Sequence, residues 1–227
     1  MKLCMIPARG GSKRIPGKNI RPFHGTPMLA RSVATAVESG VFDRIVVSTD
    51  SDAIAEVARR AGAEVPFLRP AHLSDDHATT LDVIAHTLDV IEGVSALLCL
   101  YATAPFVRGA DLRDSHALWT RTEADYVFAA TEFPFPVQRG FTLGADGSVE
   151  MLQPEHTATR SQDLPDAYHD AGQFYWCRPE AVREGRAILG PGARAHIIPR
   201  TRAQDIDTPE DWEFAEALFA VLESRGA

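Results

Sequence analysis

Short apolar runs alternate along the chain with segments in which apolar residues recur every three or four positions. The short runs predict buried strands at residues 3–6, 44–50, 64–67, 96–101 and 126–131. The periodic segments predict helices at residues 28–40, 52–62, 81–91 and 111–119. This alternation predicts an α/β fold, a mostly parallel sheet with helices on both faces.

Two of the predicted helices have recognisable start signals. Thr26, followed by a proline, predicts an N-cap for a helix whose apolar face extends to Val37. Thr208 and Asp211, with a proline between them, predict a capping box at the start of a last helix. The buried stripe expected on that last helix is Trp212, Ala215, Leu218, Phe219 and Leu222.

The middle of the chain interrupts the alternation. The tract 133–136 alternates phenylalanine with proline, and residues 141–152 predict a hairpin. Residues 172–177 then predict a strand that returns to the main sheet. We therefore expect one domain over residues 1–227, with an inserted arm at about residues 133–170.

Composition and cysteine usage exclude several classes of protein. The hydrophobic fraction is 45% and the charged fraction 24%, as in ordinary soluble proteins, and no run approaches the length of a membrane span. The first apolar run is too short for a signal peptide, so a cytoplasmic protein without a membrane partner is expected. Cys4, Cys99 and Cys177 lie far apart in apolar segments and predict reduced core residues.

The stretch from Ile6 to Asn19 carries the first chemical signal. Two adjacent glycines and Ser12 offer backbone and hydroxyl donors, and the cations beside them are Arg9, Lys13 and Lys18. Residues 1–37 contain no Asp or Glu, in a chain of net charge -8. A local positive field in an acidic protein indicates a focused anion site rather than a nucleic-acid surface.

Two alternatives compete with this interpretation. A Gly-Gly-Ser segment alone is more often a basic, solvated turn, and the acid-free run is what favours the anion site. The spacing of Gly11, Gly17 and Lys18 does not match a Walker A loop, and no G-x-G-x-x-G motif occurs. Kinase-like and dinucleotide-binding interpretations are therefore weak.

Carboxylates near the other end of the chain supply the second signal. If residues 205–207 are extended, Asp205 and Asp207 lie on one face and suit a hard cation such as Mg²⁺. The alternative is that they only precede a helix N-terminus, where negative charge is favourable. Asp50 and Asp52 form a second acidic pair, for which we favour a strand end followed by a helix cap over a metal site.

Together the basic loop and the acidic pair resemble two halves of a nucleoside-triphosphate site. Cations hold phosphates, and carboxylates hold the Mg²⁺ that bridges them. No Ser-His-Asp or Cys-His arrangement is suggested. The residues alone therefore indicate phosphoryl or nucleotidyl transfer and identify neither the base nor the acceptor.

Several motifs resemble those of a known family over nearly the whole chain. Residues 6–19, 47–50, 68–70 and 205–208 are similar to the nonulosonic acid cytidylyltransferases, the CMP-sialic acid synthetases and their relatives. The more particular motifs resemble the bacterial pseudaminic acid branch of this family; they are residues 101–106, 132–136, 160–165 and 168–176. The resemblance implies a Rossmann-like nucleotidyltransferase fold. It also implies a homodimer, with the arm packing against or reaching into the partner.

The resemblance implies that CTP and a nine-carbon 2-keto sugar acid give a CMP-sugar and pyrophosphate. Its implied nucleotide-binding residues are Ala8, Arg9, Gly10, Gly11, Ser12, Lys13, Lys18, Asn19, Arg69 and Thr80. The implied catalytic residues are Arg9, Lys18 and Asp207, and the implied Mg²⁺ ligands are Asp205 and Asp207. The implied sugar-binding residues are Tyr101, Thr103, Arg160, Gln162, His169 and Gln173.

The chain departs from the sialic acid synthetases at two positions near the expected sugar. Tyr101 stands where they have a glutamine, and Ala171 stands where they have an asparagine. Loss of two amides suits a sugar with fewer hydroxyls, as pseudaminic acid has. Arg160 is the candidate for the sugar carboxylate, with Arg139 as the fallback. His169 either contacts sugar or fills a polar pocket.

Three alternatives remain open from the sequence. The same chemistry on N-acetylneuraminic acid, legionaminic acid or Kdo is the nearest. A non-catalytic nucleotide-binding regulator is the second, although both the basic loop and the acidic pair are present. A glycosyltransferase that uses a sugar nucleotide is the third.

Overall fold

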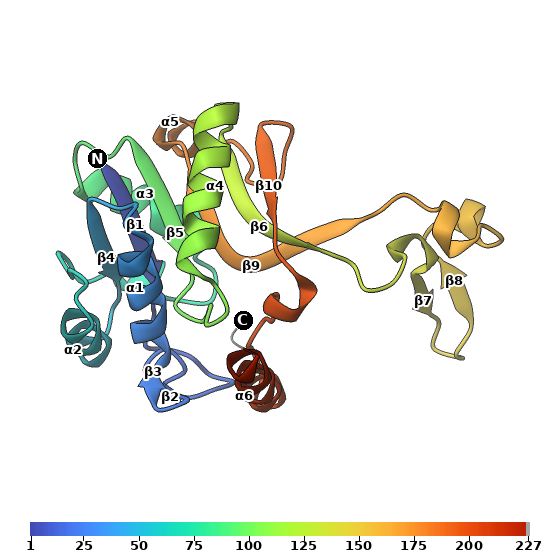
Figure 1. Ribbon diagram of the computed structural model, residues 1–227, viewed down its shortest axis with the longest axis horizontal. Coiled ribbons are helices and arrows are strands. Elements are labelled where there is room, and N and C mark those ends of the chain that lie inside the picture. Colours follow the sequence, from blue (N-terminus) through green and yellow to red (C-terminus); the bar gives the residue numbers. More distant parts are fainter. Residues whose placement is uncertain (226–227) are drawn as a thin grey trace.

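The computed structural model of the protein describes residues 1–225. Six strands form the central sheet in the order β10, β6, β9, β5, β1, β4 (Figure 1). They are β1 (Lys2–Pro7), β4 (Arg44–Ser48), β5 (Ala96–Leu100), β6 (Tyr126–Glu132), β9 (Tyr168–Cys177) and β10 (Ala193–Ile197). The strand β9 is antiparallel to both neighbours, and the other pairs are parallel. This confirms the predicted α/β fold with a mostly parallel sheet.

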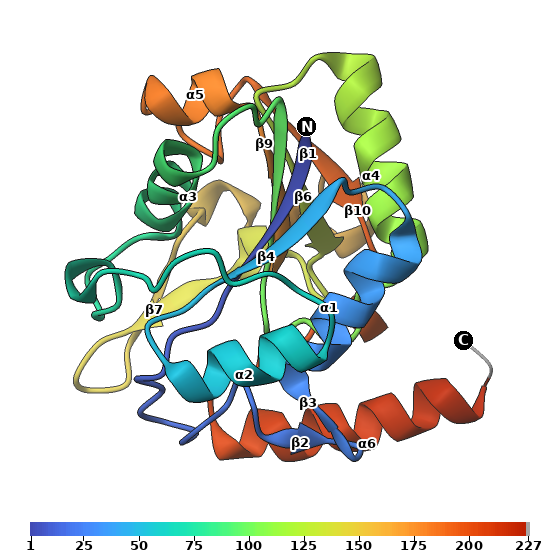
Figure 2. The ribbon, with the colours of Figure 1, turned by 90° about the vertical axis from the view of Figure 1, so that its left-hand side faces the viewer.

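Helices cover both faces of this sheet, with α1 and α4 on one side and α3 and α5 on the other (Figure 2). The α-helices are α1 (Met28–Ser39), α2 (Asp52–Arg60), α3 (Thr80–Val90), α4 (Gly109–Thr122), α5 (Pro179–Arg183) and α6 (Pro209–Ser224). Short 3₁₀ helices are η1 (Ala71–Leu73), η2 (Val137–Arg139), η3 (Pro154–His156), η4 (Ser161–Asp163) and η5 (Arg200–Arg202).

The first strand shows why the sheet is buried on both faces. Cys4 and Ile6 pack into the core on the α1 and α4 side, whereas Leu3 and Met5 pack into the core on the α3 and α5 side. All four side chains are fully buried, which explains why the strand is a continuous apolar run. The three cysteines are free and buried, as the sequence predicts.

Three local expectations were wrong. Thr26 does not cap α1: it lies in β3 (Thr26–Pro27), which pairs with β2 (Pro22–Phe23), and Pro27 takes the cap position. Val37 is 56% exposed because the inner face of α1 follows Leu29, Val33 and Ala36. Residues 64–67 form no strand; only isolated bridges, at Glu64 and Leu68, join this part of the chain to β4 and the residue after it.

The last helix packs beside the first loop of the chain. Thr208 Oγ1 accepts a hydrogen bond from the Asp211 amide at 3.2 Å, and Asp211 Oδ2 accepts one from the Thr208 amide at 2.7 Å, so the capping box is confirmed. Trp212 is buried in the same apolar cluster as Ile15 and Phe23. This packing holds residues 205–207 next to the loop that follows β1.

An arm leaves the body between β6 and β9 (Figure 1). The strands β7 (Phe141–Leu143) and β8 (Val149–Met151) pair antiparallel within it, which confirms the predicted hairpin. Large apolar side chains of the arm are exposed, namely Phe135, Phe141, Leu143, Val149 and Leu152. The arm therefore contributes little to the core of the body.

Candidate active site

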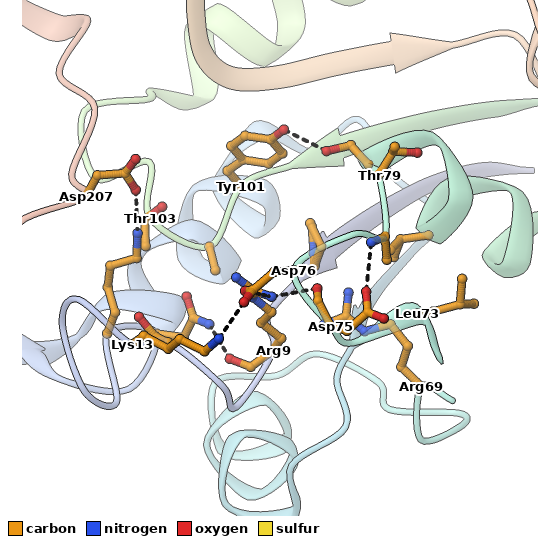
Figure 3. Close-up of a pocket in the computed structure, with 18 of the residues that line it drawn as sticks. Arg9, Lys13, Arg69, Leu73, Asp75, Asp76, Thr79, Tyr101, Thr103 and Asp207 are labelled. Carbon is orange, nitrogen blue, oxygen red and sulfur yellow. Dashed lines mark hydrogen bonds and ion pairs between the residues drawn. The ribbon is translucent and has the colours of Figure 1, made fainter. Parts of the chain in front are cut away.

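A cavity of about 570 Å³ opens beyond the carboxyl ends of β1 and β5 (Figure 3). Ligands bind at this edge in parallel α/β sheets. Its lining includes Arg9, Ser12, Lys13, Arg14, Lys18, Asn19, Arg69, Asp75, Asp76, Thr79, Thr80, Tyr101, Ala102, Thr103 and Asp207. Most of the predicted nucleotide-binding residues thus lie together, while Ala8, Gly10 and Gly11 belong to the same loop but not to the cavity lining.

Hydrogen bonds within the loop after β1, and one to the residue Asp50 beyond the end of β4, fix its conformation. The Gly10 amide donates to Asp50 Oδ1 at 2.8 Å, and Asn19 Nδ2 donates to the Arg9 carbonyl at 2.9 Å. A Cβ on Gly10 would lie 3.2 Å from Ser51 Cβ, so the approach to the end of β4 favours glycine here. Asp50 therefore holds the loop and caps no helix; Ser51 takes the cap position of α2.

Asp76, which the sequence did not single out, meets the cations of the loop, together with the backbone carbonyl of Asp75. Arg9 Nη1 lies 2.8 Å from Asp76 Oδ1, and Lys13 Nζ lies 2.6 Å from Asp76 Oδ2 (Figure 3). Arg9 also donates to the Asp75 carbonyl at 2.6 Å. Hydrogen bonds from Lys13 and then Arg9 lower the pKa of Asp76. The carboxylate of Asp76 thus contacts the cations predicted to hold phosphates.

The sequence signal that could have indicated this contact is the pair of adjacent acids, Asp75 and Asp76, shortly before the N-cap of α3. Asp75 Oδ1 accepts from the amides of His77 and Ala78 at 2.8 and 2.9 Å, which fixes the turn. That turn aims Asp76 across the cavity at the first loop. The distance along the chain between Arg9 and Asp76 hid the pairing from sequence analysis.

CTP is the ligand that the family resemblance implies for this cavity. On that expectation, Asp76→Asn should tighten CTP binding by roughly three- to tenfold, because the triphosphate would no longer compete with a carboxylate for Arg9 and Lys13. Calorimetric titration of the protein with CTP measures this change. Glu56→Gln, which removes a surface ion pair with Arg60, is the control. Weaker or unchanged CTP binding by Asp76→Asn would contradict the competition.

Lys18 connects the first loop to the segment before α6. Its Nζ donates to the Ile206 carbonyl at 2.6 Å and lies 3.2 Å from Asp207 Oδ1. Arg14 Nη2 lies 2.8 Å from the other carboxylate oxygen of Asp207. The Lys18 side chain is only 17% exposed, so this charge pair is partly shielded from water. The structure thereby places the basic loop after β1 and the acidic segment before α6 at one cavity.

The acidic pair has the donor chemistry for a divalent cation. Partial burial and then the charge of Asp207 raise the pKa of Asp205, and a cation bound between the two carboxylates would oppose both effects. Asp207 lines the cavity, whereas Asp205 does not belong to the lining, and its Oδ1 accepts from the Ile206 amide at 2.9 Å. Within residues 1–225 no three His, Cys, Asp or Glu side chains cluster as a metal site. Two carboxylates plus phosphate oxygens fit Mg²⁺, which commonly completes its shell with substrate.

Arg69 is a buried cation with unused donors. It is 6% exposed, and its Nε and Nη2 have no hydrogen-bond partner among residues 1–225. Burial lowers the pKa of Arg69, with Asp50 acting in the opposite direction. Because unsatisfied buried donors are costly, a guanidinium in the wall of a cavity suits a ligand acceptor such as a base carbonyl.

Tyr101 and Thr103 are the predicted sugar-binding residues that line the cavity. The hydroxyl groups of Tyr101 and Thr80 lie 2.8 Å apart. Burial raises the pKa of Tyr101, so its phenol stays neutral at ordinary pH. This wall therefore offers neutral hydroxyl groups, in contrast to the charged loop.

The other four predicted sugar residues lie outside this cavity lining. Arg160 and Gln162 lie on the arm, where Arg160 Nε contacts Asp163 at 2.7 Å. His169 lies against Phe133, with ring centroids 4.7 Å apart, and Gln173 turns its amide to the Arg202 carbonyl. Within one chain the structure does not bring these four side chains to the substrate cavity.

Fold and site together define a Rossmann-like nucleotidyltransferase. A family model described as Cytidylyltransferase matches residues 3–181. The chain belongs to this cytidylyltransferase family.

Similar proteins carry related names. The chain is 43% identical over 223 residues to a pseudaminic acid cytidylyltransferase of Campylobacter jejuni, covering 96% of both chains. It is 31% identical over 231 residues to a CMP-N,N'-diacetyllegionaminic acid synthase of Legionella pneumophila, covering 96% and 95%. A solved CMP:2-keto-3-deoxy-manno-octonic acid synthetase in complex with CTP superposes with a TM-score of 0.71 at 16% identity, covering 96% and 98%, which shows the shared fold. Residues 1–225 include no helix with the length and apolar character to cross a membrane.

Proposed function

We propose that this protein is a pseudaminic acid cytidylyltransferase, which converts CTP and pseudaminic acid to CMP-pseudaminic acid and pyrophosphate. The observation that carries the proposal is one cavity lined by Arg9, Lys13, Lys18 and Asp207, with the neutral wall of Tyr101 beside them. The 43% identity to the Campylobacter jejuni enzyme supports the choice of sugar.

The reaction is an attack of the anomeric 2-hydroxyl on the α-phosphorus of CTP. A new oxygen–phosphorus bond forms, the hydroxyl loses its proton, and the bond from the α-phosphorus to the bridging oxygen breaks. The electron pair of that bond leaves with pyrophosphate. Arg9, Lys13 and Lys18 offset the charge that develops on the leaving group, and the amides of the glycine loop orient the phosphates.

Asp205 and Asp207 are the residues that would hold Mg²⁺ in this site. Bound there, Mg²⁺ neutralises phosphate charge and restrains the triphosphate. Arg69 and Asn19 serve the nucleoside, and the buried donors of Arg69 select a base that presents acceptors. CTP provides such acceptors at its cytosine ring.

Product identification tests the proposal. Purified protein incubated with CTP, Mg²⁺ and pseudaminic acid should yield one pyrophosphate per CMP-sugar, with the sugar linked to the α-phosphate by mass and phosphorus spectra. Tight CTP binding without any turnover would instead favour a nucleotide-binding regulator. Cleavage of an added sugar nucleotide without pyrophosphate release would favour a glycosyltransferase.

The product would be a donor for glycosylation of bacterial surface structures such as flagellin. CTP is supplied in the cytoplasm, so we place the reaction there. Neither nucleic acid nor membrane is needed by this chemistry.

We also propose that the arm forms a homodimer. Phe135 and Leu143 are 79% and 67% exposed, and apolar surface of this kind is usually covered by a partner. An arm that reaches the partner's cavity would bring Arg160 and Gln162 to the sugar carboxylate. Both residues are proposed, on this basis, to act from the neighbouring chain.

Sedimentation velocity should therefore give twice the 24.8 kDa mass of the chain at micromolar concentration. Phe135→Glu combined with Leu143→Glu should give the single-chain mass, because charge cannot be buried in the apolar contact. Val37→Glu is the matched control, since Val37 is 56% exposed on α1 outside the arm. A monomeric wild-type protein would refute the proposed dimer.

A further inference from the structure

The strand β9 carries a pronounced bulge beside the cavity. In its pairing with β6, Tyr175 lies opposite Phe128 and Asp170 lies opposite Ala130. Five steps along β9 therefore match only two steps along β6. Gly172 has a φ of +61° within this bulge, a conformation that favours glycine.

The bulge brings together two side chains that a regular strand would separate. Residues five apart on a strand lie about 17 Å apart and on opposite faces. Here Tyr175 Oη donates to Asp170 Oδ2 at 2.7 Å, and the Gly172 amide donates to Asp170 Oδ1 at 2.8 Å. Both oxygens of the Asp170 carboxylate therefore accept hydrogen bonds that stabilise the bulge.

Two contacts join the bulge to Tyr101. The Tyr101 amide donates to the Gln173 carbonyl at 2.8 Å, and the rings of Tyr101 and Tyr175 lie with centroids 5.5 Å apart. Tyr175 is 5% exposed and does not line the cavity, whereas Tyr101 does. Burial, followed by the neighbouring Tyr101 and Asp170, raises the pKa of Tyr175, so its hydroxyl remains a donor. The chain of contacts runs from Asp170 through Tyr175 to the cavity wall.

We propose that Asp170 is a positioning residue for the acceptor sugar, which acts by holding Tyr175 and thereby the orientation of Tyr101. This inference rests on the proposed function, because Tyr101 is assigned to the sugar. In Figure 3, Tyr101 is drawn across the cavity from Lys13 and Arg9, the cations assigned to the triphosphate. Loss of Asp170 should therefore affect the sugar acid and leave CTP binding intact.

Asp170→Ala should raise KM for pseudaminic acid at least ~10-fold, with the Kd for CTP within about twofold of wild type. Tyr175→Phe should reproduce this change, because it removes the same hydrogen bond. Asp170→Asn should stay within roughly threefold of wild type, since asparagine accepts from the Gly172 amide and donates to the Tyr175 oxygen. Steady-state kinetics with each substrate varied, CTP calorimetry and thermal unfolding provide the readouts.

Tyr126→Phe is the matched control, because Tyr126 is a buried tyrosine on β6 whose hydroxyl donates to the Arg186 carbonyl at 2.9 Å, away from the cavity. It should leave both KM values unchanged. An Asp170→Ala protein with a wild-type KM for the sugar, or with CTP affinity and thermal stability lost together, would overturn the positioning role. Absence of wild-type turnover would refute the proposed function itself and this inference with it.

Discussion

Asp207→Ala is expected to lower kcat at saturating CTP, sugar acid and Mg²⁺ by about 1000-fold. The substitution removes the carboxylate that faces the cavity, and it leaves Lys18 and Arg14 without their shared partner. The Asp207 side chain is 38% exposed and lies outside the apolar core, so the fold should persist. Initial rates of pyrophosphate release across a Mg²⁺ titration measure the loss.

Glu64→Ala is the control for this substitution, because it removes a surface carboxylate that pairs with Arg44 at 2.7 Å. Its turnover should match that of wild type. Raising Mg²⁺ should not restore Asp207→Ala fully, since one ligand is missing at every concentration. Near-normal turnover of Asp207→Ala at limiting Mg²⁺ would refute the metal-binding role.

Lys18→Ala is expected to reduce kcat/KM for CTP by roughly 100- to 1000-fold. The change deletes a partly shielded charge beside the triphosphate and also frees the Ile206 carbonyl that Lys18 holds at 2.6 Å. Lys18→Arg should recover only part of the loss, because a planar guanidinium does not reproduce a compact ammonium at this position. Steady-state kinetics with CTP varied, at saturating sugar acid, test the prediction.

Arg21→Ala is the matched control within the same acid-free stretch. Arg21 lies over the Trp212 ring at 4.6 Å and does not line the cavity, so its loss should change kcat/KM less than about twofold. An equal loss in Arg21→Ala and Lys18→Ala would mean that the general positive field, and not the position of Lys18, is what matters.

Local signals in the sequence predicted the parts of the fold that depend on local physics. The apolar run of β1, the capping box of Thr208 and Asp211, and the hairpin within residues 141–152 all follow from periodicity, capping or turn chemistry. Thr26 failed as a cap because the two-stranded pairing of β2 and β3 occupies it. A competing local structure, the tight turn at His24 and Gly25, overrode the capping preference there.

The sequence predicts those parts of the candidate site that lie within one continuous motif. The basic loop and the acidic segment were visible separately, and only the fold shows that Lys18 contacts Asp207 across 189 positions. The pairing of Asp76 with Arg9 and the bulge at Asp170 depend on how distant segments approach one another. Such contacts leave no periodic pattern in one sequence.

The choice of sugar acid is tested by comparing four acids in parallel reactions. Pseudaminic acid, N-acetylneuraminic acid, legionaminic acid and Kdo are supplied in parallel with CTP and Mg²⁺, and pyrophosphate release is compared as kcat/KM. We expect kcat/KM with pseudaminic acid to be at least ~100-fold above that with the others, since Tyr101 and Ala171 stand where the sialic acid synthetases have amides. A higher kcat/KM with any of the other three acids would contradict it.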